Sequence, residues 1–408
     1  MNTLSKIYAI PDHLHALCNM LGDGLVPSNA KEGYLARMMS RRVMRMRDEL
    51  GIEKTLSELA EYHMDVNFDL TNSKQTKNGI LAILSVEEER YAETLRRGKN
   101  IVSNELKKHS KEITELPDEF YFQLNDSHGI PPGMAVQIAN NLFDGNIKLR
   151  LGFNAEMAER HAESVKVASK VKSKEFLEIN TSLVETELLY YQNSFWLEFN
   201  ARVICCEEIT HENKNITHAI LLDKTAFYPE GGGQEPDFGE IIHPDGACKV
   251  LDCQKQGSYV VHFCDSAIKV GTIIHGVVDY NRRKQLMDHH TSVHIVGGAA
   301  RKILGPHIFQ AGSNVSEEYG RLDITHYERL TRDDLNQIES LANEVLQDVD
   351  YTQKSELDRK DADLIHGFDL YQGGAPKTKN IRVLKIGSHD TQACGGTHHD
   401  ELGLIGSN

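Results

Sequence analysis

Four potential metal ligands occur in two short motifs that lie far apart in this sequence. His290 and His294 stand four residues apart in a segment of helical periodicity, so both imidazoles should lie on one helix face. Cys394 and His398 enclose two glycines and a threonine, and glycine lets the backbone turn a thiolate and an imidazole toward one point. Together the four side chains match the donor set of a tetrahedral zinc site. A fold that forms such a site must bring a helix and a distant loop into contact.

Each motif alone also has an ordinary structural explanation. A histidine pair at i and i+4 is often exposed or held by other partners, and a Cys-x-x-x-His spacing is a weaker signal still. The joint occurrence of the two motifs favours zinc. His289 and His399 flank them, and His289 points about a hundred degrees away from His290 on a helix, so we expect it to be exposed or to support a ligand.

The two motifs resemble the paired HxxxH and CxxxH motifs of the editing domain of alanyl-tRNA synthetases and of free-standing alanyl-tRNA editing proteins. Three further stretches are similar to the same family, namely LGPHIFQAGS at 304–313, RLDITHY at 321–327 and YQGG at 371–374. The resemblance implies an aminoacyl-tRNA deacylase that removes serine or glycine wrongly attached to tRNA(Ala). It also implies that Gln310 lies near the scissile ester and orients water or substrate.

A hydrolytic site of this kind has a physical rationale. A small binding pocket cannot strongly reject one added hydroxyl, so a second site that hydrogen-bonds the seryl hydroxyl improves discrimination against alanine. Zinc would polarise the ester carbonyl or lower the pKa of a water. Four protein ligands are typical of closed structural sites, however, whereas hydrolytic zinc keeps an open position. Three explanations therefore stay open. One of the four ligands is labile, or the zinc expands to five-coordination, or the zinc anchors the substrate amine instead of the nucleophile.

The N-terminal part of the chain contains a dense run of arginines. The run consists of Arg37, Arg41, Arg42, Arg45 and Arg47. On a helix, Arg37, Arg41 and Arg45 form one row, which fits either a phosphate-binding face or a solvated surface. Because the chain has a net charge of -15, attraction to a polyanion must come from such a local basic surface.

Two motifs near these arginines resemble the tRNA-recognition domain of alanyl-tRNA synthetases. They are PSN at 27–29 and the archaeal-type DSHGIPP at 126–132. The resemblance implies that Asn29 and Asp126 read the wobble pair of the acceptor stem of tRNA(Ala). From the residues alone, Asn29 with Glu32 is a helix capping box, and Asp126 begins an ordinary turn. Residues 52–120 are expected to form bundle helices, with Gly98 as a C-cap.

Between residues 180 and 280 the hydrophobic period changes to two, which predicts a small β-barrel or a strongly bent sheet. The stretch LDKTAFYPEGGGQ at 222–234 resembles the editing family again. Three consecutive glycines alone favour a sharp barrel corner, and the missing Gly-Lys-Ser/Thr continuation excludes a triphosphate loop. The resemblance implies a place beside the aminoacyl pocket, which makes Thr225 and Gln234 further catalytic candidates.

The expected fold is therefore multidomain. Residues 1–170 form a helical tRNA-recognition domain, 180–280 a β-barrel, and 281–408 an α+β zinc-binding editing domain. A Lys/Ser/Val-rich linker at 165–174 separates the first two. In the last domain, Thr331 and Asp334 give the start signal of a helix that runs to Val349.

Composition limits the class of protein. A chain of 408 residues that is 40% hydrophobic and 26% charged fits two or three globular domains. Seven irregularly spaced cysteines indicate a reducing compartment, and Cys248, Cys253 and Cys264 are expected in the core. Without a signal pattern or an apolar run that spans a bilayer, we expect a cytoplasmic protein that does not bind a membrane. The family resemblance implies tRNA(Ala), and not DNA, as its partner.

The resemblance begins at the tRNA-recognition domain and ends just after the cysteine motif, so we expect no ATP-using aminoacylation site in this chain. Two functions follow. The chain is either an editing hydrolase, or the tRNA-binding half of a split or truncated alanine-tRNA ligase whose aminoacylation subunit is a separate chain. An inactive, zinc-stabilised tRNA-binding fragment is a third possibility. Hydrolysis by the isolated chain would favour the first function.

Overall fold

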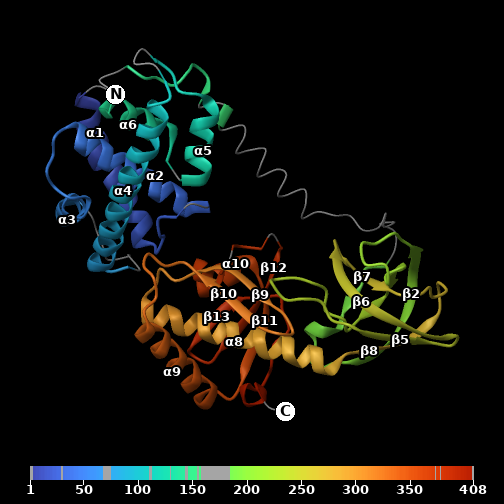
Figure 1. Cartoon of the computed structure of the whole chain (residues 1–408). Helices are drawn as coiled ribbons and strands as arrows, with labels where there is room; N and C mark the ends of the chain where they lie inside the picture. Colours follow the sequence, from blue (N-terminus) through green and yellow to red (C-terminus); the bar gives the residue numbers. More distant parts are fainter. Residues whose placement is uncertain are drawn as a thin grey trace. The chain divides into compact units, whose positions relative to one another are not determined.

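The computed structural model describes ten stretches of the chain. They are residues 3–28, 31–67, 75–109, 113–128, 130–142, 146–153, 156–157, 184–372, 374–376 and 378–406. The chain divides into two compact units, one of Met1–Lys174 with His326–Arg329 and one of Glu175–Thr325 with Leu330–Asn408 (Figure 1). Among the described helices, none combines the length and apolarity that crossing a membrane requires.

The first unit is helical, as the sequence predicted. Its described helices are α1 (Thr3–Gly22), α2 (Lys31–Glu49), α3 (Leu56–Asn67), α4 (Lys77–Leu106), α5 (Asp118–His128) and α6 (Pro132–Leu142). They share one apolar core, to which Leu17, Met44 and Ile80 contribute fully buried side chains. The Thr76 hydroxyl caps α4 by accepting a hydrogen bond from the Gly79 N–H at 3.1 Å.

Two local predictions for this unit are wrong. Gly98 is not a C-cap, because it lies buried inside α4, where a Cβ would come within 2.8 Å of Ile138 Cδ1. Its missing side chain lets α6 approach α4. The predicted turn also begins later than Asp126, because residues 126–128 still belong to α5, whose Tyr121 and Leu124 side chains are buried in the core, and α6 begins at Pro132. The expected cap residue Asn29 and the linker at 165–174 lie outside the described residues.

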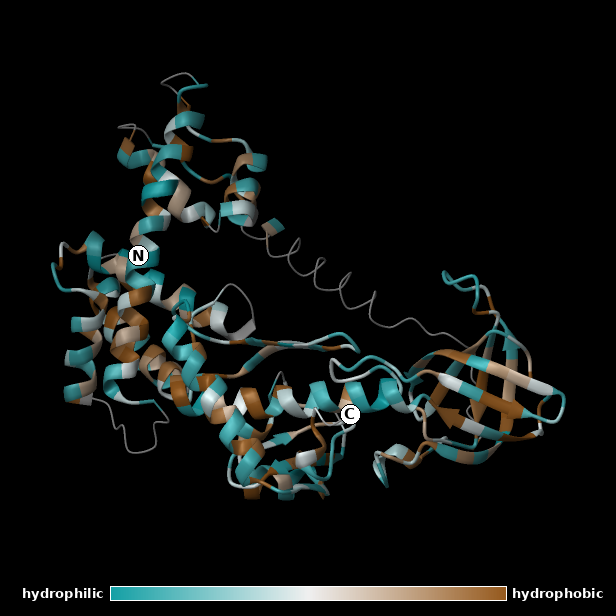
Figure 2. Cartoon of the chain, turned by 60° about the horizontal axis from the view of Figure 1, so that its bottom comes forward, coloured by the Kyte–Doolittle hydropathy of each residue, from teal (hydrophilic) through white to brown (hydrophobic). Residues whose placement is uncertain are grey.

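The second unit contains a closed barrel, which confirms one of the two alternatives that the sequence left open. Its strands are β2 (Glu198–Glu208), β3 (His218–Leu222), β5 (Gly239–His243), β6 (Gly246–Gln256), β7 (Tyr259–Cys264) and β8 (Ile273–Val278), joined in the order β2-β3-β7-β6-β5-β8. Along β2, the buried residues Phe199, Ala201 and Val203 alternate with exposed ones. Figure 2 shows this mixture of brown and teal along the barrel strands. Closure leaves no unpaired strand edge.

The strand cysteines are core residues, as expected. Cys248, Cys253 and Cys264 are all buried in the barrel. Beside the barrel, the short strands β1 (Glu187–Leu188) and β4 (Lys224–Thr225) pair in parallel. The latter strand leads into the triple-glycine loop.

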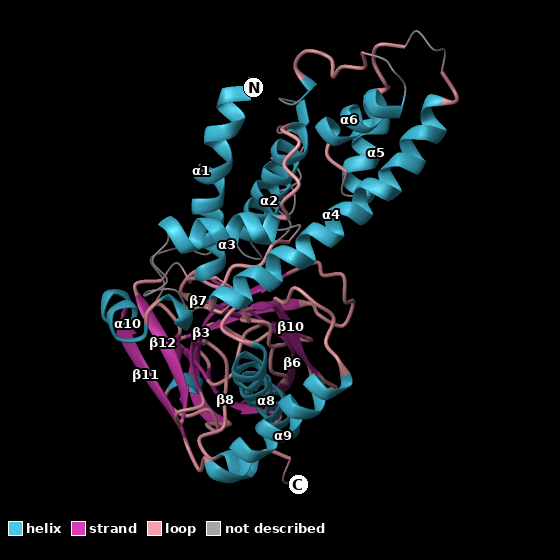
Figure 3. Ribbon diagram, turned by 90° about the vertical axis from the view of Figure 1, so that its left-hand side faces the viewer, coloured by secondary structure: helices cyan, strands magenta, loops and turns pink. Residues whose placement is uncertain are grey.

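The rest of the second unit mixes helices and strands. The elements are α8 (Tyr280–Leu304), β9 (Gln310–Val315), β10 (Gly320–Ile324), α9 (Arg332–Asp348), β11 (Thr352–Asp358), α10 (Arg359–His366), β12 (Asn380–Ile386) and β13 (Asp390–Ala393), with 3-10 turns η1 (Leu189–Tyr191), η2 (Phe368–Leu370) and η3 (Leu402–Leu404). The first two of these strands form a hairpin, and β11, β12 and β13 form an antiparallel sheet. Figure 3 shows the helices of this unit in cyan and its strands in magenta.

A common core joins the two helices to the sheet. Ile295 from α8, Ile338 from α9 and Leu384 from β12 all belong to it. The capping box that was predicted for α9 is present, because Thr331 and Asp334 exchange side-chain to backbone hydrogen bonds. Helix α8 therefore has a fixed position relative to the loop that follows β13.

Candidate functional site

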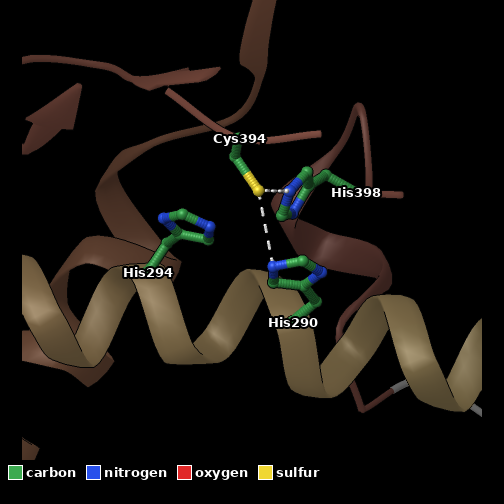
Figure 4. Close-up of side chains that lie close together, drawn as sticks. All are labelled: His290, His294, Cys394 and His398. Carbon is green, nitrogen blue, oxygen red and sulfur yellow. Dashed lines mark hydrogen bonds between the residues drawn. The ribbon is translucent and has the colours of Figure 1, made fainter. Parts of the chain in front are cut away.

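Helix α8 holds the first two potential ligands. Asp279 is its N-cap, with a carboxylate that accepts from the Arg282 N–H, and the helix buries Leu286 and Met287. His290 and His294 project from the same side of this helix and are only 4% and 5% exposed. Figure 4 shows both rings directed toward the loop after β13. Such burial of two imidazoles requires partners, because an unpaired polar group inside a protein is costly.

The loop after β13 places Cys394 and His398 opposite this pair. The ligand atoms of the four residues all lie within 4.8 Å of one another. Cys394 Sγ lies 3.4 Å from His290 Nε2 and 3.2 Å from His398 Nε2. A tetrahedral zinc ion separates its nitrogen and sulfur ligands by about 3.3–3.6 Å. These two sulfur–nitrogen distances and the donor set of the four residues therefore fit zinc.

The protonation states also suit a metal. Burial lowers the pKa of His294 to about 4 and holds the pKa values of His290 and His398 well below their usual range. Neutral imidazole is the form that binds metal ions. Burial raises the pKa of the Cys394 thiol, while the Gly396 N–H and the Arg382 cation oppose that rise. A divalent cation beside the sulfur would favour the thiolate.

The glycines of the cysteine loop have a steric role. A Cβ at Gly396 would lie 2.1 Å from His290 Cε1, so only glycine lets this backbone pass the imidazole. Arg382 donates hydrogen bonds to the carbonyls of Cys394 and Gly396, and Lys354 donates to the His398 carbonyl at 2.6 Å. Two cations of neighbouring strands therefore hold the loop in place.

Gln234, a catalytic candidate from the triple-glycine loop, lies in contact with the cluster. Its side chain is fully buried, and its Oε1 lies 2.7 Å from His290 Nδ1. Its amide also bonds Thr397, inside the Cys-x-x-x-His motif. The structure thus brings Gln234 together with the four potential ligands, as a partner of one of them.

The two flanking histidines have partners of their own. His289 donates from Nδ1 to the Ser316 carbonyl at 2.7 Å, and its Nε2 contacts Gln285. His399 Nε2 lies 2.6 Å from an Asp288 carboxylate oxygen. His289 therefore connects α8 to the backbone at Ser316, and His399 connects the loop after β13 to Asp288 of α8. Neither histidine belongs to the four-residue cluster.

Gln310 lies at the start of β9 and lines a pocket beside the cluster. Other residues at this pocket are Val293, Arg301, Gln372, Asp390 and Gln392. The Gln310 amide Nε2 donates to the Ser313 hydroxyl at 3.0 Å. His294 Nδ1 lies 4.0 Å from a carboxylate oxygen of Asp390, so the pocket adjoins the potential metal ligands.

The pocket contains polar groups that our reading of the sequence missed. Asp390 is mostly buried, which raises the pKa of its carboxyl to about 6. A signal was present, since Asp390 and Gln392 stand close before Cys394 on a strand that leads to this potential ligand. Their part in the pocket depends on packing between β13 and α8, which no local pattern reveals.

Thr225 lies in a different environment. Its side chain is fully buried beside the barrel, and its hydroxyl lies 2.8 Å from His262 Nε2. His262 Nδ1 donates to the Ile220 carbonyl, so Nε2 accepts the Thr225 proton, and the hydroxyl in turn accepts from the Phe227 N–H. In the described part of the chain, Thr225 makes no hydrogen bond to the four cluster residues, and its catalytic role stays a prediction.

The arginine row lies in a partly buried ion-pair network. Arg37 Nε and Arg41 Nε lie 3.2 and 3.1 Å from the two carboxylate oxygens of Glu87, and the arginine side chains are 14% and 15% exposed. A phosphate contact by either would have to use other guanidinium nitrogens. Arg45 is half-buried on the same helix. Asn29 and the Asp126 side chain lie outside the described residues.

Glu87 is a further residue that the sequence analysis did not single out. It falls on the apolar stripe of α4 that Ile80, Ile83, Leu84 and Tyr91 define, and it is 2% exposed. An acid on such a stripe must be paired with a cation. That signal predicts a cationic partner for Glu87, although it does not predict which residues provide it.

These features define a class of protein. In this class a helical unit is followed by a barrel, and a helix and a distant loop then bring together three histidines and a cysteine. The family model described as tRNA synthetases class II (A) matches residues 1–282. The chain therefore belongs to the class II alanyl-tRNA synthetase family. This finding confirms the resemblance seen in its motifs.

Individual relatives agree with the family match. The chain is 41% identical to an alanine–tRNA ligase of Thermococcus kodakarensis, over 98% of this chain and 43% of the relative. It is 40% identical to the alanine–tRNA ligase of Pyrococcus furiosus, over 98% of this chain and 43% of the relative. It is 38% identical to the alanine–tRNA ligase of Ignicoccus hospitalis, over 99% of this chain and 44% of the relative. The chain thus spans less than half the length of these curated relatives. Because a class II synthetase model matches it, the expected lack of an aminoacylation site stays a prediction.

Proposed function

We propose that this chain binds tRNA(Ala) and hydrolyses seryl- or glycyl-tRNA(Ala) at a zinc site held by His290, His294, Cys394 and His398. The observation that supports the proposal is the position of this buried cluster beside a pocket with polar side chains. Membership of the alanyl-tRNA synthetase family makes tRNA(Ala) the expected partner.

Zinc bound by these residues would supply Lewis-acid chemistry, by polarising an ester carbonyl or acidifying a water. Gln310 would orient the substrate or the attacking water from the pocket wall. Asp390 and Gln392 would pair with the seryl hydroxyl or the amino group. Alanine would leave such groups unpaired, which is the physical basis of a preference for serine.

The test is release of labelled serine from purified seryl-tRNA(Ala) without ATP. We expect the zinc-loaded chain to release serine faster than alanine, and the Cys394→Ala and Gln310→Ala variants to lose this activity. Cys205→Ala is the matched control, because Cys205 is also partly buried but lies on a barrel strand. If the zinc-loaded parent releases serine no faster than buffer, the proposal is wrong.

A second function is supported by the family match itself. The relatives are named as ligases, and the class II model matches residues 1–282. The chain would then be the tRNA-binding part of an alanine-tRNA ligase, with ATP-dependent aminoacylation supplied by another polypeptide. Binding of tRNA(Ala) together with charging only after addition of that polypeptide, and with no serine release, would favour this function.

A further inference from the structure

The buried amide of Gln234 makes three hydrogen bonds, and these bonds determine which way the amide is turned. The Thr397 backbone N–H, which can only donate, lies 3.1 Å from one end of the amide. That end must therefore be the carbonyl oxygen Oε1. The other end, Nε2, donates to the Thr397 hydroxyl at 2.8 Å, which agrees with this orientation.

The orientation of the amide decides the tautomer of His290. The same Oε1 lies 2.7 Å from His290 Nδ1, and because Oε1 only accepts, Nδ1 must carry the proton. A neutral imidazole with a proton on Nδ1 has its lone pair on Nε2. That nitrogen is the one 3.4 Å from Cys394 Sγ, inside the cluster.

The triple-glycine loop holds Gln234 in this position. Gly233 adopts φ +83°, and a Cβ there would lie 2.5 Å from the Ser313 hydroxyl oxygen, so glycine is needed for the loop to lie against β9. The Val315 N–H donates to the Gly233 carbonyl at 2.7 Å, and the Glu235 N–H donates to the Val315 carbonyl at 3.0 Å. The backbone on both sides of Gln234 is thus bonded to one strand.

From these contacts we infer that Gln234 is a positioning residue, which fixes the Nδ1-protonated tautomer of His290 and so presents Nε2 to the metal. The triple-glycine loop then supports the metal site from the barrel side. Hydrogen-bond partners of metal-binding histidines act in this way in other zinc sites. The inference rests on the proposed zinc site, and it deepens that proposal by giving a role to a residue outside the four potential ligands.

One measurement uses the parent protein alone. Nitrogen-15 NMR of the reduced, metal-free protein reports which imidazole nitrogen carries the proton. We expect His290 to be protonated on Nδ1 before any metal is added. Protonation of His290 on Nε2 in this sample would overturn the inference, whatever the protein's activity.

A second measurement compares zinc affinity by competition with a chelator. Gln234→Leu keeps the approximate volume but removes the acceptor, and we expect zinc to bind about 10–100-fold more weakly. Gln234→Glu keeps an acceptor for Nδ1, so it should bind zinc as the parent does. Thr186→Val is the control, because it removes another buried hydrogen-bonding side chain within the second unit, one that bonds the Leu222 carbonyl.

The outcomes separate this inference from the proposed function. Parent-like zinc affinity in a folded Gln234→Leu variant would overturn the inference, even if the parent deacylates seryl-tRNA. A parent that binds zinc with the expected tautomer but releases no serine would overturn the proposed function alone. If Gln234→Leu does not fold, the tautomer of His290 in the parent still decides.

Discussion

Arg283 of helix α8 and Asp237 of the loop before β5 form an ion pair that solvent does not reach, with side chains 0% and 1% exposed. The guanidinium also donates to the carbonyls of Ala226 and Ser194, and the Asp237 carboxylate accepts from the Tyr228 N–H at 2.6 Å. This pair connects the helix that bears His290 to the barrel and to the segment before it. It therefore sets the position of α8 relative to the triple-glycine loop.

Removing Asp237 should destabilise the second unit strongly. Asp237→Ala leaves the Arg283 charge buried without its partner, so we expect the free energy of unfolding to fall by about 3–5 kcal/mol. Glu317→Gln is the control, because Glu317 pairs with the neighbouring Arg282 but is 53% exposed. That change should alter stability by less than about 1 kcal/mol. Urea unfolding of the three proteins measures both effects, and equal losses would contradict the account.

The metal cluster predicts one zinc ion per chain. We expect metal analysis of the purified parent to give this stoichiometry, and the Cys394→Ala, His398→Ala double variant to lose it. Retention of stoichiometric zinc in the double variant would refute the ligand assignment.

Removal of zinc should also lower the unfolding temperature of the second unit. The metal would join His290 to Cys394, which are 104 residues apart, and so oppose separation of α8 from the last sheet. Thermal unfolding with and without a chelator checks this expectation. The double variant should show no response to the chelator.

The barrel should lose stability at acid pH through His262. Burial lowers the pKa of this histidine to about 4, whereas an unfolded chain has a histidine pKa of about 6.5. Above pH 6.5 both states are neutral and the effect is absent. As the pH falls from 6.5 toward 4, only the unfolded chain binds the proton, so the free energy of unfolding decreases by about 1.4 kcal/mol per pH unit.

A variant isolates this effect from that of other buried histidines. His262→Gln has no titratable group at this position, so its free energy of unfolding should fall less than that of the parent as the pH falls from 6.5 toward 4. Urea unfolding at several pH values measures the difference. Two parallel stability curves would mean that His262 does not titrate as we expect.

Binding of tRNA should separate the arginines from the base-reading candidates. If Arg45 contacts a phosphate, replacing it by alanine should make the negative slope of log affinity against log salt less steep by about 0.9. Asn29→Ala and Asp126→Ala should weaken discrimination between tRNA(Ala) and an acceptor-stem variant by about 1–3 kcal/mol. Equal weakening of both RNAs would argue against base reading.

Replacement of Arg37 or Arg41 should have an additional effect on stability. Both bond Glu87, which is 2% exposed, so their loss leaves a buried carboxylate with one cation fewer. We expect lower stability of the first unit together with weaker RNA binding. The matched double change Arg37→Ala, Glu87→Gln should recover part of the stability but not the binding.

The sequence by itself determined features that neighbouring residues encode. The start of α9 follows from Thr331 and Asp334, which satisfy each other's backbone groups within one helical turn. His290 and His294 share a face because they are one helical turn apart, and alternating residues of β2 predict one buried face. The residue types and the spacing of Cys394 and His398 also indicated the other half of a zinc donor set.

Tertiary structure alone decided how the distant side chains are used. Gln234 supports His290 across 56 residues of sequence, and Glu87 binds arginines 50 and 46 residues away. Gly98, which was expected to end a helix, lies inside one because α6 packs against it. Local propensity describes what a segment prefers by itself. The partners of a buried polar group are set by which segments the fold packs together, because desolvation makes an unpaired group unfavourable wherever it is buried.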